Sequence, residues 1–317
     1  MAFLKGFSNL GYATLTNHIR ENLVQYFDYG LLEKGNFSNI EIPTTGYYGG
    51  SEHSLRVVDD PRYSYGQVWE GFKSNWVWQS GIGALTSTDD ANPGVSGVYV
   101  DSTFYPSSGV GEYAHHINHP LGRVIFDSPI STSSDVECEY SYKHINVVKV
   151  DGLNWFQELQ KNSERSENPN FNSGSGDYAI LSDNRYQTPA IGIETGGSRR
   201  GTPYQLGGGQ IFKTDFYFHC IAEDGYTRDT LTDIVSLQNL HNMRTFNLNE
   251  VSSSGAFPLD YRGVPNSGAM LYPELINTYQ GTEIRLIDLN IDSVYSISSD
   301  IHVGTVKFTA ETIIFGV

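Results

Sequence analysis

The chain has 317 residues, and 20 Lys and Arg face 36 Asp and Glu, for a formal net charge of −16. Nucleic-acid phosphates and anionic membrane surfaces repel such a charge, so we expect neither a membrane nor a specifically recognised nucleic acid as a partner. Disordered chains are poor in aromatic residues, whereas this chain holds 21 Tyr and 16 Phe and is expected to fold. Its 33 Gly residues and 18% charged residues favour a β-rich fold with many turns.

The first predicted element is a helix near residues 9–29. Ser8 is its expected N-cap and Gly30 its expected end. The next segment, residues 35–66, is rich in Gly and Pro and is predicted to be a loop. One apolar stripe predicts the helix, because its members recur every four positions: Leu15, Ile19, Leu23 and Phe27.

Strands dominate the rest of the first half. Apolar and polar side chains alternate over residues 135–142, which predicts one continuous strand. Shorter strands are predicted at 98–100, 123–127 and 145–150. We expect residues 1–150 to form an N-terminal domain that consists of the helix and a β-rich region.

The second half predicts a separate domain at residues 177–317, after a short helix and a polar linker at residues 151–176. Its expected elements are a strand at 189–194, a Gly-rich connection at 195–209, a long strand at 210–222, a helix at 227–241 with Thr227 as N-cap, a loop at 249–280, and a hairpin of strands at 283–295 and 302–315. The predicted fold class is α+β, with an antiparallel sheet and one packed helix in the C-terminal domain. The N-terminal region is expected to be β-rich and preceded by a helix.

Three histidines form the densest group of titratable residues. His115 and His119 have the spacing that zinc peptidases use on a helix, but His116 stands where that motif needs a Glu. Pro120 follows at once, so a helix is not expected here. We predict a hydrogen-bonded or solvent-exposed turn, and a metal hydrolase remains an alternative.

Three tryptophans, Trp69, Trp76 and Trp78, lie close together in the sequence. Such a group favours an aromatic core for a small domain. An exposed group could instead bind sugars or a partner protein. The second interpretation would make the chain a glycan-binding or glycan-degrading fibre component.

The glycines between residues 195 and 209 suggest a phosphate loop, but no Gly-Lys-Ser/Thr follows them and no helix begins there. A hairpin extension is favoured, and Arg199 and Arg200 are candidates for contacts with a partner. Cys138 and Cys220 are expected to be free thiols buried in strands. The sequence therefore predicts no catalytic, cofactor-binding or metal-binding residue, and the protein is not expected to be an enzyme.

The order of elements in the C-terminal half resembles that of tail-terminator (tail-completion) proteins of tailed bacteriophages. The strands at 189–194 and 211–222, the helix around 229–235 and the hairpin that ends at 304–309 carry this resemblance. The segments 122–129 and 136–142 are similar to small β units of phage neck and connector proteins.

This resemblance implies a structural virion protein at the head–tail junction, assembled in the host cytoplasm. Copies of such a protein form a homo-oligomeric ring, commonly a hexamer, that joins the tail tube to the connector and lets DNA pass. The implied partners are other copies of the chain, tail tube or sheath proteins and connector proteins, and the family supplies no catalytic residues. The expected contact residues are Arg199, Arg200 and the 249–280 segment, and a baseplate, collar or decoration protein is the alternative within the virion.

Overall fold

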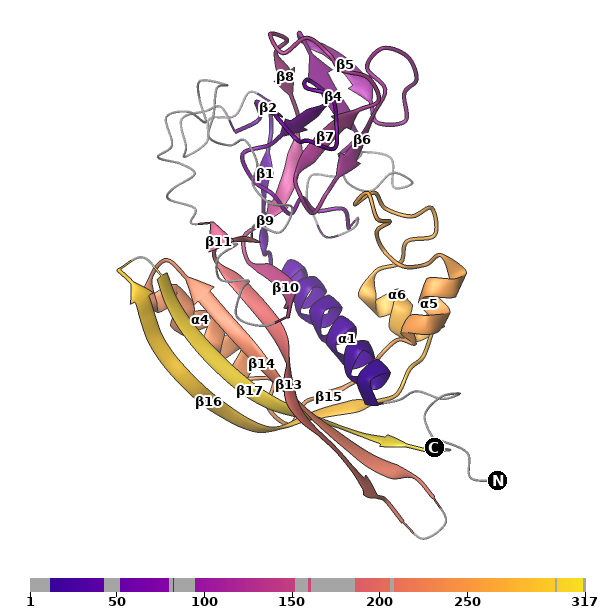
Figure 1. Cartoon of the computed structure of the whole chain (residues 1–317), viewed down its shortest axis with the longest axis vertical. Helices are drawn as coiled ribbons and strands as arrows, with labels where there is room; N and C mark the ends of the chain where they lie inside the picture. Colours follow the sequence, from indigo (N-terminus) through magenta and orange to yellow (C-terminus); the bar gives the residue numbers. More distant parts are fainter. Residues whose placement is uncertain are drawn as a thin grey trace.

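Figure 1 shows the computed structural model, which describes residues 12–42, 52–79, 82, 95–151, 159–160, 186–205, 208–299 and 301–315. A large curled sheet occupies the lower part of this view, and a smaller β-rich unit lies above it. Helix α1 (Tyr12–Glu33) lies across the sheet, between it and helices α5 and α6. The α+β class predicted from the sequence is confirmed.

Helix α1 forms where the apolar stripe predicts it, because one side of it is buried against the sheet. It continues through Gly30, so the expected end there is wrong. The helix is closed by Gly35, whose φ of 88° is a left-handed conformation that glycine adopts without strain. The backbone N–H groups of Gly35 and Asn36 donate to the carbonyls of Leu32 and Leu31, which is the Schellman arrangement. Ser8 lies outside the described residues.

The large sheet has six strands in the order β10-β13-β14-β17-β16-β15. The β10–β13 pair is parallel, and the other neighbouring strands are antiparallel. The strands are β10 (Asn146–Val150), β13 (Ala190–Pro203), β14 (Gln210–Ala222), β15 (Asn242–Met243), β16 (Ile284–Ser298) and β17 (Ile301–Ile314).

The Gly-rich connection expected at residues 195–209 is mostly strand, which corrects that prediction. β13 continues to Pro203 and pairs with β14, with one irregularity between Thr195 and Arg199. Pairing along a long neighbour outweighs the low strand propensity of glycine here. Gly196 also has a steric role, since a Cβ at that position would lie 2.9 Å from the Cβ of Asp215.

The main core lies on one face of this sheet. Alternate residues of β14 point to that face, among them Phe216 and Phe218, and both are fully buried. The ring of Phe27 on α1 lies 5.3 Å from that of Phe218, and the ring of Phe308 on β17 lies 5.7 Å from it. The burial of each such ring contributes roughly 1.5–3 kcal/mol to the stability of the folded chain.

Helix α4 (Gly225–Ser236) packs on the same face through Leu231 and Val235. Its N-cap is Asp224, whose Oδ1 accepts the N–H of Thr227 at 2.8 Å, so the expected cap at Thr227 is corrected. Two helices, α1 and α4, therefore cover one face of the sheet.

The segment 249–280, expected to be a loop, holds two short helices, α5 (Leu248–Ser254) and α6 (Tyr272–Thr278). The side chain of Asn247 caps α5 and donates to Glu250 at 2.8 Å, and Gly255 ends it with a φ of 74°. Local capping residues thus specify α5, and the prediction missed them because the prolines of this segment favoured a loop.

The β-rich unit contains a four-stranded sheet in the order β2-β3-β7-β6, a three-stranded sheet in the order β5-β4-β8, and the pair β1-β9. Its strands are β1 (Phe37–Ile40), β2 (Arg56–Val58), β3 (Val68–Glu70), β4 (Gly97–Val100), β5 (Thr103–Pro106), β6 (His115–Asn118), β7 (Arg123–Phe126), β8 (Val136–Glu137) and β9 (Tyr140–Lys143).

Two predictions for this unit are corrected. Residues 35–66 contain strands β1 and β2: β1 pairs with the distant β9, whereas β2 pairs with β3, the next strand along the chain. Residues 135–142 do not form one strand: the chain breaks at Cys138 and Glu139, since β8 pairs with β4 whereas β9 pairs with β1.

A buried ion pair joins the β-rich unit to α1. The ammonium of Lys143 lies 2.7 and 2.9 Å from the two carboxylate oxygens of Asp28, and the amide of Gln79 donates to the same carboxylate at 3.1 Å. Beside it, Asn75 donates to Asn146 of β10 at 2.6 Å. Removing one partner of such a pair leaves an uncompensated buried charge, so the contact fixes the unit on the helix.

The predicted division at residue 150 stays a prediction, but α1 and β10 precede it and contribute to the core of the large sheet. The predicted linker at residues 151–176 lies outside the described residues, apart from Asp151 and strand β11 (Leu159–Gln160). β11 pairs in parallel with β12 (Tyr186–Gln187).

Candidate assembly surface

Strand β16 forms an open side of the large sheet. β17 pairs with one side of it, whereas on the other side β15 pairs only with Ile284 and Arg285, and Leu286 exchanges backbone hydrogen bonds with residues 240 and 241. Beyond that point no described strand pairs with its outer side. We call residues 287–298 the β16 edge. Unpaired N–H and C=O groups on such an edge can accept a strand from another chain.

The β16 edge also presents large apolar side chains to solvent. Ile291, Val294, Tyr295 and Ile297 are 47%, 50%, 44% and 55% exposed. Val294 lies opposite Gly304 and Tyr295 opposite Val303 on β17, so the exposed side chains occupy both faces of the sheet. Large apolar side chains exposed along an unpaired strand mark a site of association.

On the other side of the sheet, beyond the end of β10, no described strand pairs with the outer side of β13. The last paired residue of β13 on this side is Glu194, opposite Val150, whereas β13 continues to Pro203. We call residues 197–203 the β13 edge, and all of them are exposed. Arg199 and Arg200 lie here, and within the described residues neither guanidinium forms an ion pair. Sequence reasoning selected these two residues, although it placed them in a loop.

Between the two edges, the sheet face opposite the helices carries polar pairs. Lys307 lies 2.9 Å from Asp215, and this hydrogen bond raises the pKa of Lys307. His219 lies 2.8 Å from Glu194. Cys220 points to the helix face, and burial raises the pKa of its thiol to about 12. These side chains are engaged with one another or buried, so they stabilise the sheet.

The three histidines belong to strand β6 and its end, so the predicted turn is wrong for His115 and His116. Of the two alternatives, hydrogen-bonded or solvent-exposed, the hydrogen-bonded one holds for His115 and His119. His115 and His119 are buried, because alternate side chains of β6 point into the unit. Nδ1 of His119 lies 3.1 Å from the carbonyl of Gly263, and Nδ1 of His115 lies 2.8 Å from that of Tyr113. Burial lowers the pKa of His115, and it lowers the pKa of His119 to about 4. These two rings serve the packing of the unit.

The three tryptophans are buried, which confirms their interpretation as an aromatic core. Trp69, Trp76 and Trp78 are 3%, 1% and 6% exposed. Trp76 stacks on Tyr140 at 4.3 Å, and its indole N–H donates to the carbonyl of Lys73. The interpretation of these residues as an exposed sugar platform is wrong. The two cysteines are free and buried, as expected, but only Cys220 lies in a strand, because Cys138 lies in the break between β8 and β9.

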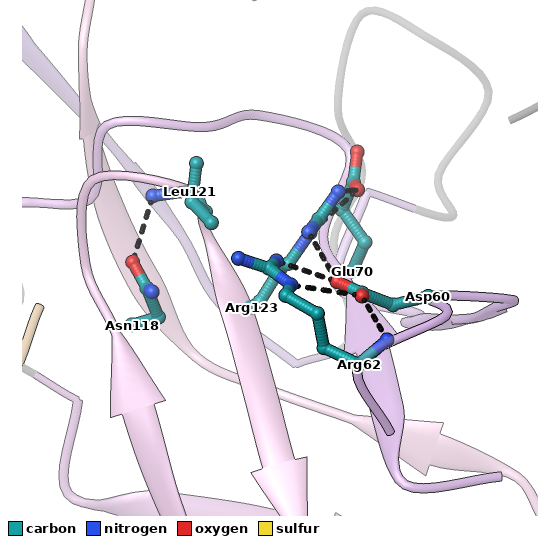
Figure 2. Close-up of polar contacts among 6 residues, drawn as sticks. All are labelled: Asp60, Arg62, Glu70, Asn118, Leu121 and Arg123. Carbon is teal, nitrogen blue, oxygen red and sulfur yellow. Dashed lines mark hydrogen bonds and ion pairs between the residues drawn. The ribbon is translucent and has the colours of Figure 1, made fainter. Parts of the chain in front are cut away.

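Figure 2 shows a buried ionic cluster on the four-stranded sheet. Arg123 lies opposite Glu70 in the neighbouring strand and donates to it at 3.0 Å. Asp60 lies 3.4 Å from Arg123 and 2.6 Å from Arg62, and the hydrogen bond from Arg62 contributes most to lowering its pKa. Both carboxylates are therefore paired with arginine, and the cluster fastens the segment around Asp60 to the sheet. The sequence pattern did not indicate this pairing, because the residues come from separate segments.

A cavity of about 490 Å³ lies where the β-rich unit meets the large sheet. The ammonium of Lys73 lies above the ring of Tyr142 at 5.4 Å on one wall. On another wall, Thr188 donates to Glu223 at 2.6 Å, next to the helix cap Asp224. These polar groups thus take part in contacts within the fold, whereas the buried amide nitrogen of Gln187, which also lines the cavity, has no hydrogen-bond partner among the described residues.

No protein-family model matches the chain, and no curated protein matches it. Across the described residues, no cluster of three or more His, Cys, Asp and Glu could hold a metal ion. The helices of the described part lack a stretch that is both long and apolar enough to cross a membrane.

Proposed function

We propose that this chain is a structural subunit of a tailed-bacteriophage virion that assembles with copies of itself into a ring at the head–tail junction. The observation that carries the proposal is the β16 edge, where an unpaired strand and four exposed apolar side chains occur together. Strand addition at an open edge supplies main-chain hydrogen bonds, and the apolar side chains supply burial. This combination suits a permanent contact between subunits.

The position at the head–tail junction is supported by the resemblance of the C-terminal elements to tail-terminator proteins. The sheet has the expected long strands β14, β16 and β17, together with helix α4. The net charge of −16 also suits a ring through which DNA moves, because like charges keep the duplex from binding to the wall.

The test has two parts. Native mass spectrometry and negative-stain microscopy of the purified chain should show closed rings, with a hexamer as the expected form. Immunogold labelling of phage particles that carry the protein should mark the neck. A label at the baseplate, along the collar fibres or on the capsid would contradict the position, and a strictly monomeric chain absent from virions would contradict the function.

A matched pair of variants links assembly to the edge. Val294→Asp places a charge in the β16 edge and should abolish the rings. Leu237→Asp changes a side chain that is 80% exposed at the C-terminal end of α4, and this variant should still form rings. If both variants lose ring assembly to the same extent, the β16 edge is not the surface through which the subunits associate.

A further inference from the structure

The two open edges of the large sheet differ in charge. The β13 edge carries Arg199 and Arg200, whereas the β16 edge carries Asp288 and Asp292. Within the described residues, none of these four side chains forms a direct ion pair, although the negative charge of Asp292 adds to the raised pKa of Lys307 on β17. Arg199 and Arg200 stand side by side in a chain with 20 basic and 36 acidic residues, so the β13 edge concentrates positive charge. Neighbouring lysines of the same sheet are already neutralised: Lys213 by Glu311 and Lys307 by Asp215.

We propose that copies of the chain join head to tail, with the β13 edge of one copy against the β16 edge of the next. This inference rests on the proposed function, since it names the surface through which the ring closes. A contact between two different surfaces of identical subunits generates a ring when the rotation closes. The six strands of each subunit would then continue into those of its neighbour.

Charge favours this arrangement over a two-fold dimer. Pairing two β16 edges would bring Asp288 and Asp292 of one copy close to the same residues of the other, and like charges across a contact are destabilising. Pairing two β13 edges would likewise oppose arginine with arginine. Only the head-to-tail contact places guanidinium groups beside carboxylates.

The two open segments lie at opposite ends of the sheet. Residues 199–203 of β13 pair with residues 210–214 of β14, which in turn pair with residues 310–314 of β17. The paired part of the β16 edge instead lies along residues 301–309 of β17. A contact between the edges is therefore staggered along the strand direction. Strands that close around an axis need such a stagger, because they tilt relative to that axis.

The β16 edge is irregular in a way that restricts its partners. Its register with β17 shifts at three places, and Asp288 has a φ of 54°. Such bulges interrupt the ladder and twist an edge, which prevents unlimited addition of strands. The edge can then accept a partner whose shape and charge match it, and the β13 edge of a second copy supplies the matching charge.

Charge reversal with complementation tests this contact. Variant A carries Arg199→Glu and Arg200→Glu. Variant B carries Asp292→Arg together with Asp288→Asn, because Asn tolerates a positive φ whereas a longer side chain is strained there. All four side chains are exposed, so both variants should keep the thermal unfolding midpoint and circular dichroism spectrum of the wild type.

Each variant alone should self-associate about tenfold or more weakly than the wild type in sedimentation velocity or native mass spectrometry. An equimolar mixture of A and B should restore the rings with the two variants alternating, because the acidic β13 edge of A then meets the basic β16 edge of B. The control Asp233→Arg reverses a charge on α4, away from both edges, and should assemble as the wild type does.

The head-to-tail contact would be overturned if variants A and B fold and each assembles normally on its own. It would also be overturned if their mixture does not form rings. In either case, rings of the wild type would still support the proposed function. Loss of assembly in Asp233→Arg would also overturn the head-to-tail contact, since association would then depend on total charge. A wild-type chain that stays monomeric would contradict both proposals.

Discussion

His119 allows a quantitative prediction about acid stability. Its ring is 3% exposed, Nδ1 lies 3.1 Å from the carbonyl of Gly263, and Nε2 is buried without a hydrogen-bond partner. Burial is the main cause that lowers the pKa of His119 from 6.5 to about 4, and the charge of Lys143 adds to it. The folded chain therefore holds this ring neutral at a pH where the unfolded chain protonates it.

The sign and size of the effect follow from linkage. Below pH 6.5 the unfolded state binds more protons than the folded state, so the free energy of unfolding falls as the pH falls from 6.5 towards about 4. At about pH 5 the loss from His119 alone is about 2 kcal/mol relative to about pH 7.5, and it approaches about 3 kcal/mol below the folded pKa. Burial also lowers the pKa of His115 and of His18, which act in the same direction.

The measurement is urea unfolding of the wild type and of His119→Asn at both pH values. Asn keeps an amide donor near the position of Nδ1 and cannot titrate, so the difference in stability between the two pH values should shrink by about 2 kcal/mol. His241→Asn changes an exposed histidine and controls for the substitution itself. If the free energy of unfolding of His119→Asn differs between the two pH values as much as that of the wild type does, the buried neutral imidazole does not limit acid stability.

Three further substitutions test the packing. Asp28→Asn leaves the buried ammonium of Lys143 without its counter-ion and should cost about 3–5 kcal/mol in urea unfolding, whereas the double change Asp28→Leu with Lys143→Met should recover most of that loss. Gly304→Ala places a Cβ 2.4 Å from Oγ1 of Thr232 and should lower the thermal unfolding midpoint, and adding Thr232→Ala should restore part of it. Trp76→Ala removes a side chain that is 1% exposed and should cost about 3–5 kcal/mol. If Asp28→Asn or Trp76→Ala lowers the free energy of unfolding by less than about 1 kcal/mol, the ion pair or the aromatic packing does not stabilise the fold as argued. If Gly304→Ala unfolds at the same temperature as the wild type, the close approach to Thr232 is contradicted.

Several features needed only local patterns. The four-residue recurrence of Leu15, Ile19, Leu23 and Phe27 predicted α1, because one side of a helix returns at that spacing. The alternation of apolar and polar side chains predicted β14 and β17, because successive side chains of a strand point to opposite faces. The capping residues Asn247 and Gly255 would also have indicated α5, although the prolines nearby hid them.

Other features depend on partners that are distant in the sequence. The break at Cys138 and Glu139 exists because the two halves of that segment pair with different strands, and the burial of His119 depends on the carbonyl of Gly263. No local pattern contains such pairings, since many segments could supply a matching strand or acceptor.

The sequence by itself determined the periodicity of the helices and strands, the acidic charge and the adjacency of Arg199 and Arg200, since these belong to neighbouring residues. Only the tertiary structure decided that α1 covers the C-terminal sheet and that β16 and the end of β13 are its open edges. The position of a strand within a sheet is a relation between distant segments, fixed when their backbones pair and their apolar faces are buried together.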